Sequence, residues 1–161
     1  MKTRRLDNYG KINRDKILSF RWDKKNYKGF EGDTLASALL ANNIGIVGRS
    51  FKYHRPRGIF SSGVEESGAL VTIGSKDRRD PNVRATTQEL YNGLEASGQN
   101  AFPNVNFDLA GINNYLGRFF AAGFYYKTFM GIPPFEWGRG TAIWMFFEKF
   151  IRKAAGMGSA S

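Results

Sequence analysis

The sequence predicts an α+β fold in which a small mixed sheet packs against one helix, followed by an aromatic-rich extension and a C-terminal helix. Three features carry this prediction: an alternating strand over residues 17–22, an amphipathic helix that begins near Asp33, and an apolar strand over residues 69–73. The order strand, strand, helix, loop, strand is typical of an α+β domain.

The first elements form a hairpin. Residues 1–16 are polar and basic, and we expect them to form an N-terminal arm. Residues 17–22 place an apolar side chain at every second position, as in a half-buried strand. Residues 23–26 are turn-like, and residues 27–30 return as a second strand. A β-hairpin is therefore the simplest interpretation.

A helix follows the hairpin. We expect Asp33 to be its N-cap, because a carboxylate there can accept hydrogen bonds from the free amides of the first turn. Leu35, Ala38 and Leu39 follow at helical spacing, and two asparagines end the segment after Ala41. The apolar residues of this helix are therefore predicted to cover the sheet.

The chain is expected to divide into the arm, a sheet domain over residues 17–96, and a connecting segment with a helix over residues 97–161. Twelve of its 24 aromatic residues fall within residues 119–150, and residues 139–154 have the spacing of an amphipathic helix. Aromatic and Met side chains are enriched in the cores of interfaces. We therefore predict a permanent protein–protein or interdomain contact through Phe124, Tyr125, Tyr126, Phe129 and Met130.

Composition excludes several kinds of site. The chain has no cysteine, so disulfides, thiolate zinc sites, cysteine nucleophiles and an all-cysteine iron–sulfur cluster are excluded within these residues. His54 is the only histidine, too few for a histidine metal site, and we predict no catalytic residue. No secretory signal follows the basic start, and the longest apolar run has six residues, so we expect a cytoplasmic chain without a membrane span.

The basic loop (residues 49–58) is the densest polar cluster, in a chain whose net charge is +10. Guanidinium groups bind phosphates and carboxylates, and aromatic rings can stack on a planar ligand. Such a loop suits a nucleotide cofactor, a nucleic acid or an acidic protein surface; it could also be a solvated loop that pairs with Glu65, Glu66 and other local acids. The candidate binding residues are Arg49, Lys52, Tyr53, His54, Arg55 and Arg57.

Three segments together resemble one family: residues 32–42, residues 47–60 and residues 124–130. From about Ile12 to its end, the chain is similar to the beginning of the α subunit of heterotetrameric sarcosine oxidases. The first domain of that family resembles a plant-type [2Fe–2S] ferredoxin, which implies a ferredoxin-like β-grasp fold. In cluster-bearing relatives four cysteines hold the iron. The resemblance places those positions at Ser61, Glu66, Ala69 and Thr86, and so implies the fold without the cluster or any other metal.

The resemblance also implies an activity that requires further domains and subunits besides this chain. Such enzymes oxidatively demethylate sarcosine to glycine, produce hydrogen peroxide and pass a one-carbon unit to tetrahydrofolate. They use FAD, FMN and NAD. The resemblance implies an NAD site in a Rossmann-type domain that follows this segment, a folate site in a later aminomethyltransferase-like domain, and a substrate-oxidising flavin in the β subunit. We therefore expect a structural, non-catalytic amino-terminal domain that binds no cofactor alone and leads toward a dinucleotide-binding domain. Its expected partners are the other α-subunit domains and the β, γ and δ subunits, with no nucleic acid and no membrane.

Two other hypotheses stay open. The first is an independent basic module that binds an acidic protein or nucleic acid through the basic loop. The second is an electron-transfer ferredoxin, which the missing thiolates strongly disfavour.

Overall fold

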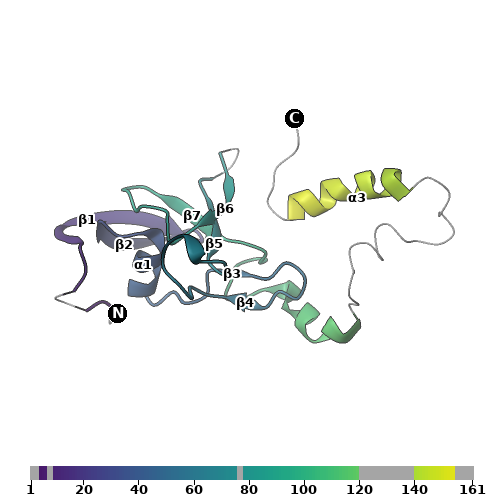
Figure 1. Cartoon of the computed structure of the whole chain (residues 1–161), viewed down its shortest axis with the longest axis horizontal. Helices are drawn as coiled ribbons and strands as arrows, with labels where there is room; N and C mark the ends of the chain where they lie inside the picture. Colours follow the sequence, from purple (N-terminus) through teal and green to yellow (C-terminus); the bar gives the residue numbers. More distant parts are fainter. Residues whose placement is uncertain (1–3, 7–8, 76–77, 120–139, 155–161) are drawn as a thin grey trace.

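The computed structural model describes residues 4–6, 9–75, 78–119 and 140–154, and a five-stranded mixed sheet is its main element (Figure 1). The sheet contains β1 (Asn13–Trp22), β2 (Lys25–Glu31), β5 (Leu70–Ile73), β6 (Asp80–Arg84) and β7 (Glu95–Gly98). A separate ladder joins β3 (Gly48–Arg49) to β4 (Pro56–Arg57). The helices are α1 (Leu35–Ala41) and α3 (Gly140–Ala154), with 3-10 helices η1 (Gly63–Glu65), η2 (Leu109–Asn114) and η3 (Leu116–Phe119).

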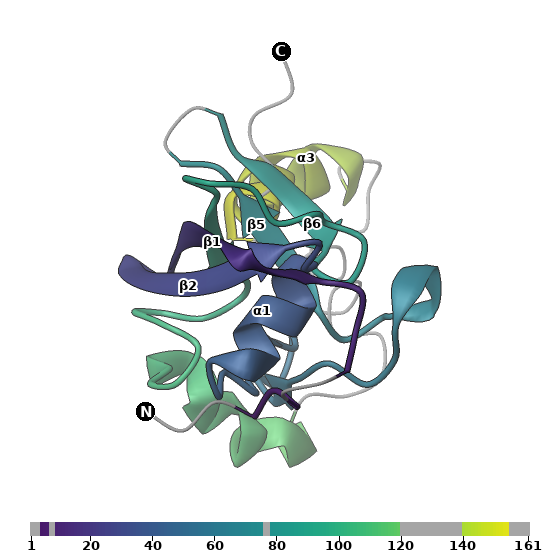
Figure 2. The same ribbon diagram turned by 90° about the vertical axis from the view of Figure 1, so that its left-hand side faces the viewer.

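The strand order is β2-β1-β7-β5-β6. β1 and β7 pair in parallel at the centre, while β2 is antiparallel to β1, and β5 is antiparallel to both β7 and β6. α1 follows the first hairpin and crosses one face of the sheet (Figure 2). This is the β-grasp arrangement, so the predicted α+β, ferredoxin-like fold class is confirmed.

The core lies between the sheet and α1. Leu18, Phe20 and Trp22 occupy alternate positions of β1, and each is less than a tenth exposed. They meet Leu35 and Leu39 of α1, which are fully buried. The buried side chains alternate along β1 and follow helical spacing along α1. The two sets form one apolar layer, as the sequence pattern predicts.

The helix begins differently from the prediction. Thr34, not Asp33, is the N-cap: its hydroxyl accepts from the Ser37 amide, and the Ser37 hydroxyl accepts from the Thr34 amide. This reciprocal capping box satisfies two amides that a helix start would otherwise leave unpaired. The Asp33 carboxylate instead accepts from the Phe30 amide at 2.9 Å and the Ser37 hydroxyl at 2.7 Å, and it has one further partner.

That partner comes from the N-terminal segment. Arg5 donates to both carboxylate oxygens of Asp33, at 2.9 and 2.7 Å, and its guanidinium lies 5.2 Å from the centre of the Phe30 ring. Asp33 is only 1% exposed. Strand β1 also starts at Asn13, earlier than the predicted residue 17. The part of the arm around Arg5 is therefore docked onto the domain.

Two strands of the sheet, β6 and β7, were not predicted. The helix predicted at residues 139–154 is present as α3. Of its described side chains, Met145, Phe146 and Phe150 are exposed. The predicted contact residues Phe124, Tyr125, Tyr126, Phe129 and Met130 lie outside the described residues.

Candidate functional site

The Glu66 loop (residues 58–69), which connects β4 to β5, closes around one buried carboxylate. Oε2 of Glu66 accepts hydrogen bonds from the backbone amides of Phe60 and Ser61, each at 2.7 Å. Oε1 accepts from the amides of Gly68 and Ala69, the latter at 3.1 Å. Four amides thus point at a single carboxylate that is 1% exposed.

These contacts decide the charge state of Glu66. Burial raises the pKa of its carboxyl, but the backbone amides of Ser61, Gly68, Phe60 and Ala69 together outweigh burial and lower it from 4.5 to about 2. Hydrogen bonds to the charged form favour that form. Glu66 is therefore an ionised, fully satisfied buried anion at neutral pH.

The four positions that the resemblance matches to cluster cysteines converge on this loop. Ser61 and Ala69 contact Glu66 through their amides. The Thr86 hydroxyl donates to the carbonyl of Gly63, inside the loop, at 2.6 Å. The residue before Thr86 also contacts this loop, because the Ala85 amide donates to the carbonyl of Ala69 at 2.9 Å.

The residues at these positions do not fit an iron–sulfur cluster. They offer two hydroxyls, one carboxylate and a methyl group instead of four thiolates, and Ala69 has no ligand atom. The only charged side chain among them, Glu66, is already engaged by four amides. These four residues therefore do not provide the ligands that an iron–sulfur cluster needs.

The basic loop is the second feature of the site. Arg49 is held internally: Nε donates to the Val105 carbonyl at 2.9 Å, and Nη1 donates to the His54 carbonyl at 3.0 Å. Its Nε also lies 3.7 Å from Oδ2 of Asp108. Arg49 is thus a structural cation, and its acidic partner is Asp108 rather than Glu65 or Glu66.

His54 is also fixed by Asp108. Its Nδ1 lies 2.8 Å from Oδ2 of Asp108, whose side chain is fully buried. Burial raises the pKa of the Asp108 carboxyl, but the Phe102 amide, His54 and the Ala110 amide outweigh it, so the pKa lies below its ordinary value. The pair anchors the basic loop to the segment before η2, and no nucleophile appears beside it in the contacts described.

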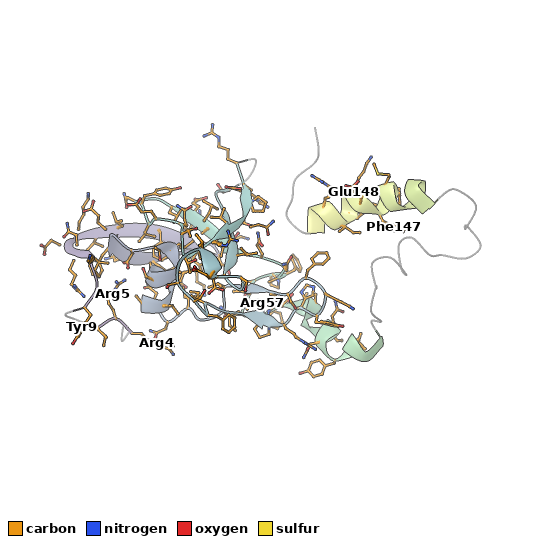
Figure 3. All side chains as sticks on the ribbon, viewed as in Figure 1. Arg4, Arg5, Tyr9, Arg57, Phe147 and Glu148 are labelled. Carbon is orange, nitrogen blue, oxygen red and sulfur yellow. The ribbon has the colours of Figure 1, made fainter. Side chains whose placement is uncertain are left out.

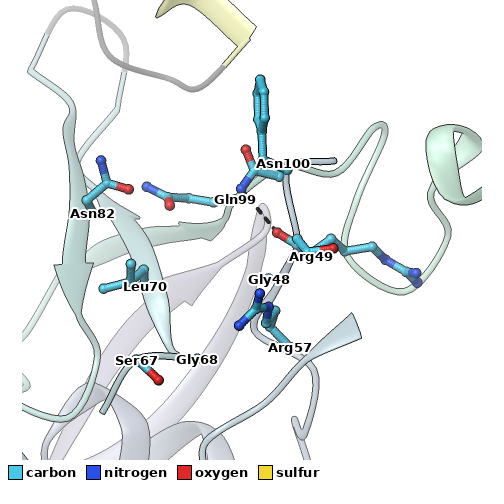
Figure 4. Close-up of a pocket in the computed structure, with 11 residues that line it drawn as sticks. Gly48, Arg49, Arg57, Ser67, Gly68, Leu70, Asn82, Gln99 and Asn100 are labelled. Atoms are coloured by element: carbon cyan, nitrogen blue, oxygen red, sulfur yellow. Dashed lines mark hydrogen bonds between the residues drawn. The ribbon is translucent and has the colours of Figure 1, made fainter. Parts of the chain in front are cut away.

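The remaining candidates complete the basic loop, with Lys52 and Tyr53 half-buried and Arg55 and Arg57 exposed. Lys52 and Arg55 lie 4.9 and 4.7 Å from the centre of the Tyr53 ring, and Nε of Arg55 donates to Asn114 at 2.9 Å. Arg57 is exposed on β4 (Figure 3). It lines a cavity of about 180 Å³ together with Arg49, Gln99 and Asn100, whose amide donates to the Arg49 carbonyl (Figure 4). The structure therefore brings all six candidates onto one hairpin, with different roles.

An apolar surface that the sequence analysis missed adjoins the basic loop. We call it the apolar segment (residues 102–116), and two contacts already described, His54–Asp108 and Arg55–Asn114, join it to the loop. Its exposed large side chains are Phe102, Phe107, Leu109, Ile112, Tyr115 and Leu116. The one sequence signal was the apolar spacing within Leu109–Leu116, which lies among Gly and Asn residues.

Two tests for other kinds of site are negative within the described ranges. Among the described residues, no group of three or more His, Asp or Glu side chains lies close enough together to hold a metal ion. No helix in those ranges has both the length and the apolar character needed to cross a bilayer.

Comparison with known proteins agrees with this geometry. Residues 15–101 match the model of the 2Fe-2S iron-sulfur cluster binding domain, and the chain belongs to this family. The 161 residues of this member include no cysteine.

The relatives give a more particular likeness. The chain is 52% identical to sarcosine oxidase subunit alpha of Rhizobium meliloti (strain 1021) over the whole chain, which corresponds to 16% of that protein. It is 46% identical to sarcosine oxidase subunit alpha of Corynebacterium sp. (strain U-96) over 54% of this chain and 9% of that protein. The resemblance to sarcosine oxidase α subunits is thereby confirmed, and the chain spans only about a sixth or less of their length. An L-proline dehydrogenase from P. horikoshii aligns with a TM-score of 0.45 and 25% identity, over 54% of this chain and 16% of that one.

Proposed function

We propose that this chain is the amino-terminal structural domain of an oxidase of the sarcosine oxidase type, and that its task is docking rather than electron transfer. The observation that carries the proposal is the filled Glu66 loop. A domain of a cluster-binding family here keeps its sheet and helix, while a carboxylate takes up the amides at the cluster positions. What such a domain can still offer its enzyme is a folded surface.

We assign the chemistry to the whole enzyme. It would be a cytoplasmic oxidase that demethylates sarcosine to glycine, releases hydrogen peroxide and transfers a one-carbon unit to tetrahydrofolate. The enzyme would use FAD, FMN and NAD, with NAD in a further α-subunit domain and the substrate-oxidising flavin in the β subunit. The partners of this chain would be the other α-subunit domains and the β, γ and δ subunits. The proposal is supported by the 52% identity to sarcosine oxidase subunit alpha of Rhizobium meliloti, a protein of which this chain matches 16%.

The docking face we propose combines the apolar segment with the basic loop. Large exposed apolar side chains are unusual in such density on a monomer surface, and they mark interaction sites. Lys52, Arg55 and Arg57 would add a cationic rim beside them. An apolar centre with a charged rim is the usual anatomy of a protein–protein interface.

The test is co-purification from the native host, followed by identification of the bound polypeptides and an assay of sarcosine-dependent peroxide. We expect flavin-containing oxidase domains or subunits to accompany the chain, with activity in the assembly and none in the 161 residues alone. Recovery of nucleic acid or unrelated acidic proteins instead, released by salt, would support the independent basic module.

A pair of matched variants tests the docking face. Ile112→Asp places a charge in the apolar segment, while Ile17→Asp makes the same change at a similarly exposed position on β1. We expect the first to reduce recovery of partners at least tenfold and the second to leave it unchanged. Equal recovery with both variants would place the interface elsewhere.

A further inference from the structure

The Glu66 loop has the construction of an anion-binding site. Four backbone amides, from Phe60, Ser61, Gly68 and Ala69, converge on a point that solvent does not reach. Successive amides that point into one concavity bind anions, including phosphates and iron–sulfur clusters. Without an acceptor these donors would be buried and unsatisfied, which is strongly unfavourable.

We propose that this loop is a small-anion site whose resident ligand is the chain's own Glu66 carboxylate, and that free formate or acetate occupies it when that side chain is removed. The tethered carboxylate supplies the negative charge that a bound cluster supplies in other members of the family. The site therefore takes its ligand from within the chain.

The surroundings of the carboxylate explain why the loop needs an anion rather than any polar group of similar shape. All four amide contacts are donated to Glu66, and the Ser61 hydroxyl adds a long contact at 3.5 Å, so a glutamine in its place would turn its own NH₂ toward N–H donors. A neighbouring cation, Arg84, donates Nε to the backbone carbonyl of Glu66 at 3.2 Å. The amides themselves thus hold the charge.

The loop is too tightly closed to adapt by collapse. A side chain at Gly68 would meet the Gly58 carbonyl at 2.7 Å and the Phe60 ring at 2.9 Å. The Thr86 hydroxyl fixes the opposite side through Gly63 at 2.6 Å. Removing the carboxylate is therefore expected to leave a cavity lined by amides, with dimensions suited to a one- or two-carbon carboxylate.

The experiment compares wild type, Glu66→Ala, Glu66→Gln and the control Glu65→Ala by urea unfolding of the full 161-residue chain at pH 7. Glu65 is the exposed neighbour within the same loop, so its variant makes the same change of charge away from the four amides that hold Glu66. Each protein is measured in sodium formate, in sodium acetate and in sodium chloride of equal ionic strength.

We expect lower urea midpoints for Glu66→Ala and Glu66→Gln and an unchanged midpoint for Glu65→Ala. Formate should raise the midpoint of Glu66→Ala along a saturating curve and recover at least half of the loss, with no such rise for wild type, Glu65→Ala or Glu66→Gln. If Glu66→Ala is unfolded without anion, refolding in formate but not in chloride is the same result, read by circular dichroism.

Three results would overturn the proposal. The first is a wild-type midpoint for Glu66→Gln, because a neutral isostere would then suffice. The second is an equal effect of formate and chloride on Glu66→Ala, which is a general salt effect. The third is an unfolded Glu66→Ala that formate does not refold. None of these outcomes depends on co-purification, so the docking function succeeds or fails separately.

Discussion

The backbone amide of Ser61 donates to Oε2 of Glu66 across 2.7 Å, and this bond is one of four that hold a single carboxylate inside the loop. Because the donors are backbone groups, the loop conformation and the ionisation of Glu66 are linked. The conformation of the loop is expected to depend on that charge.

Acid should remove the contribution of the ionised Glu66 carboxylate to the stability of the fold, and it should do so over a defined range of pH. The pKa of Glu66 lies at about 2 in the folded chain and at 4.5 for an ordinary glutamate. Its stabilising effect is therefore fully present above pH 4.5 and is lost as the pH falls toward 2. Urea midpoints of wild type and Glu66→Gln should differ most above pH 4.5 and converge toward pH 2. A difference that stays constant across this range would contradict the expectation.

Arg5 should be worth much more to stability than its neighbour Arg4. Arg5→Ala leaves the Asp33 carboxylate, which is 1% exposed, without its bidentate partner. Loss of one partner of a buried pair typically costs roughly 3–5 kcal/mol, and we expect the lower end because the Arg5 side chain is itself 16% exposed. Thermal or urea unfolding measures the difference.

The control for Arg5 is Arg4→Ala, which removes the same charge from an exposed side chain in the same segment (Figure 3). We expect a change within about 0.5 kcal/mol for it. Equal effects of the two variants would mean that the Asp33 contact does not stabilise the fold.

Asp108 should hold the basic loop in place. Asp108→Asn replaces a buried carboxylate that accepts from the Phe102 amide at 3.0 Å and contacts His54 and Arg49. We expect a loss of about 1–3 kcal/mol. The contribution is present above the ordinary pKa of 3.8 and is lost as the pH falls through the lower folded value. Hydrogen exchange of residues 49–58 should become faster, whereas the exposed control Asp80→Asn should leave it unchanged.

Gly98 tests the packing between β7 and the segment after it. A Cβ atom there would overlap Cγ1 of Val105 and lie 3.0 Å from the Val47 carbonyl. Overpacking of this kind costs about 1–3 kcal/mol, so Gly98→Ala should lower the unfolding midpoint. Gly45→Ala is the control, since a Cβ atom at Gly45 meets nothing within 4 Å. A midpoint for Gly98→Ala equal to that of Gly45→Ala would show that this junction is loosely packed.

The sequence pattern found the elements with a clear apolar period and missed two strands that have none. β1 and α1 were predictable because Phe20 and Leu39 belong to clear periodic runs. β7 reads Glu-Ala-Ser-Gly, and only its pairing with β1 and β5 makes it a strand. β6 alternates intermediate and exposed positions and contains a proline, which gives it a weak strand signal.

The site was predictable by position but not by chemistry. The family resemblance pointed to Ser61, Glu66, Ala69 and Thr86, and these four residues lie around one loop in the structure. The resemblance did not indicate that the loop amides would donate to the Glu66 carboxylate, because every residue type except proline carries a backbone amide. The partnership of His54 with Asp108 joins residues 54 positions apart, and no local pattern encodes such a contact.

The most direct measurement of the central claim, that a buried carboxylate fills the Glu66 loop, is a ¹³C NMR titration of the Glu66 side-chain carboxyl in the folded chain. The structure predicts a carboxylate that stays ionised down to about pH 2, with titration only there or on unfolding. A carboxyl that titrates near 4.5, with no change in the Ser61 amide signal as it does so, would contradict the claim.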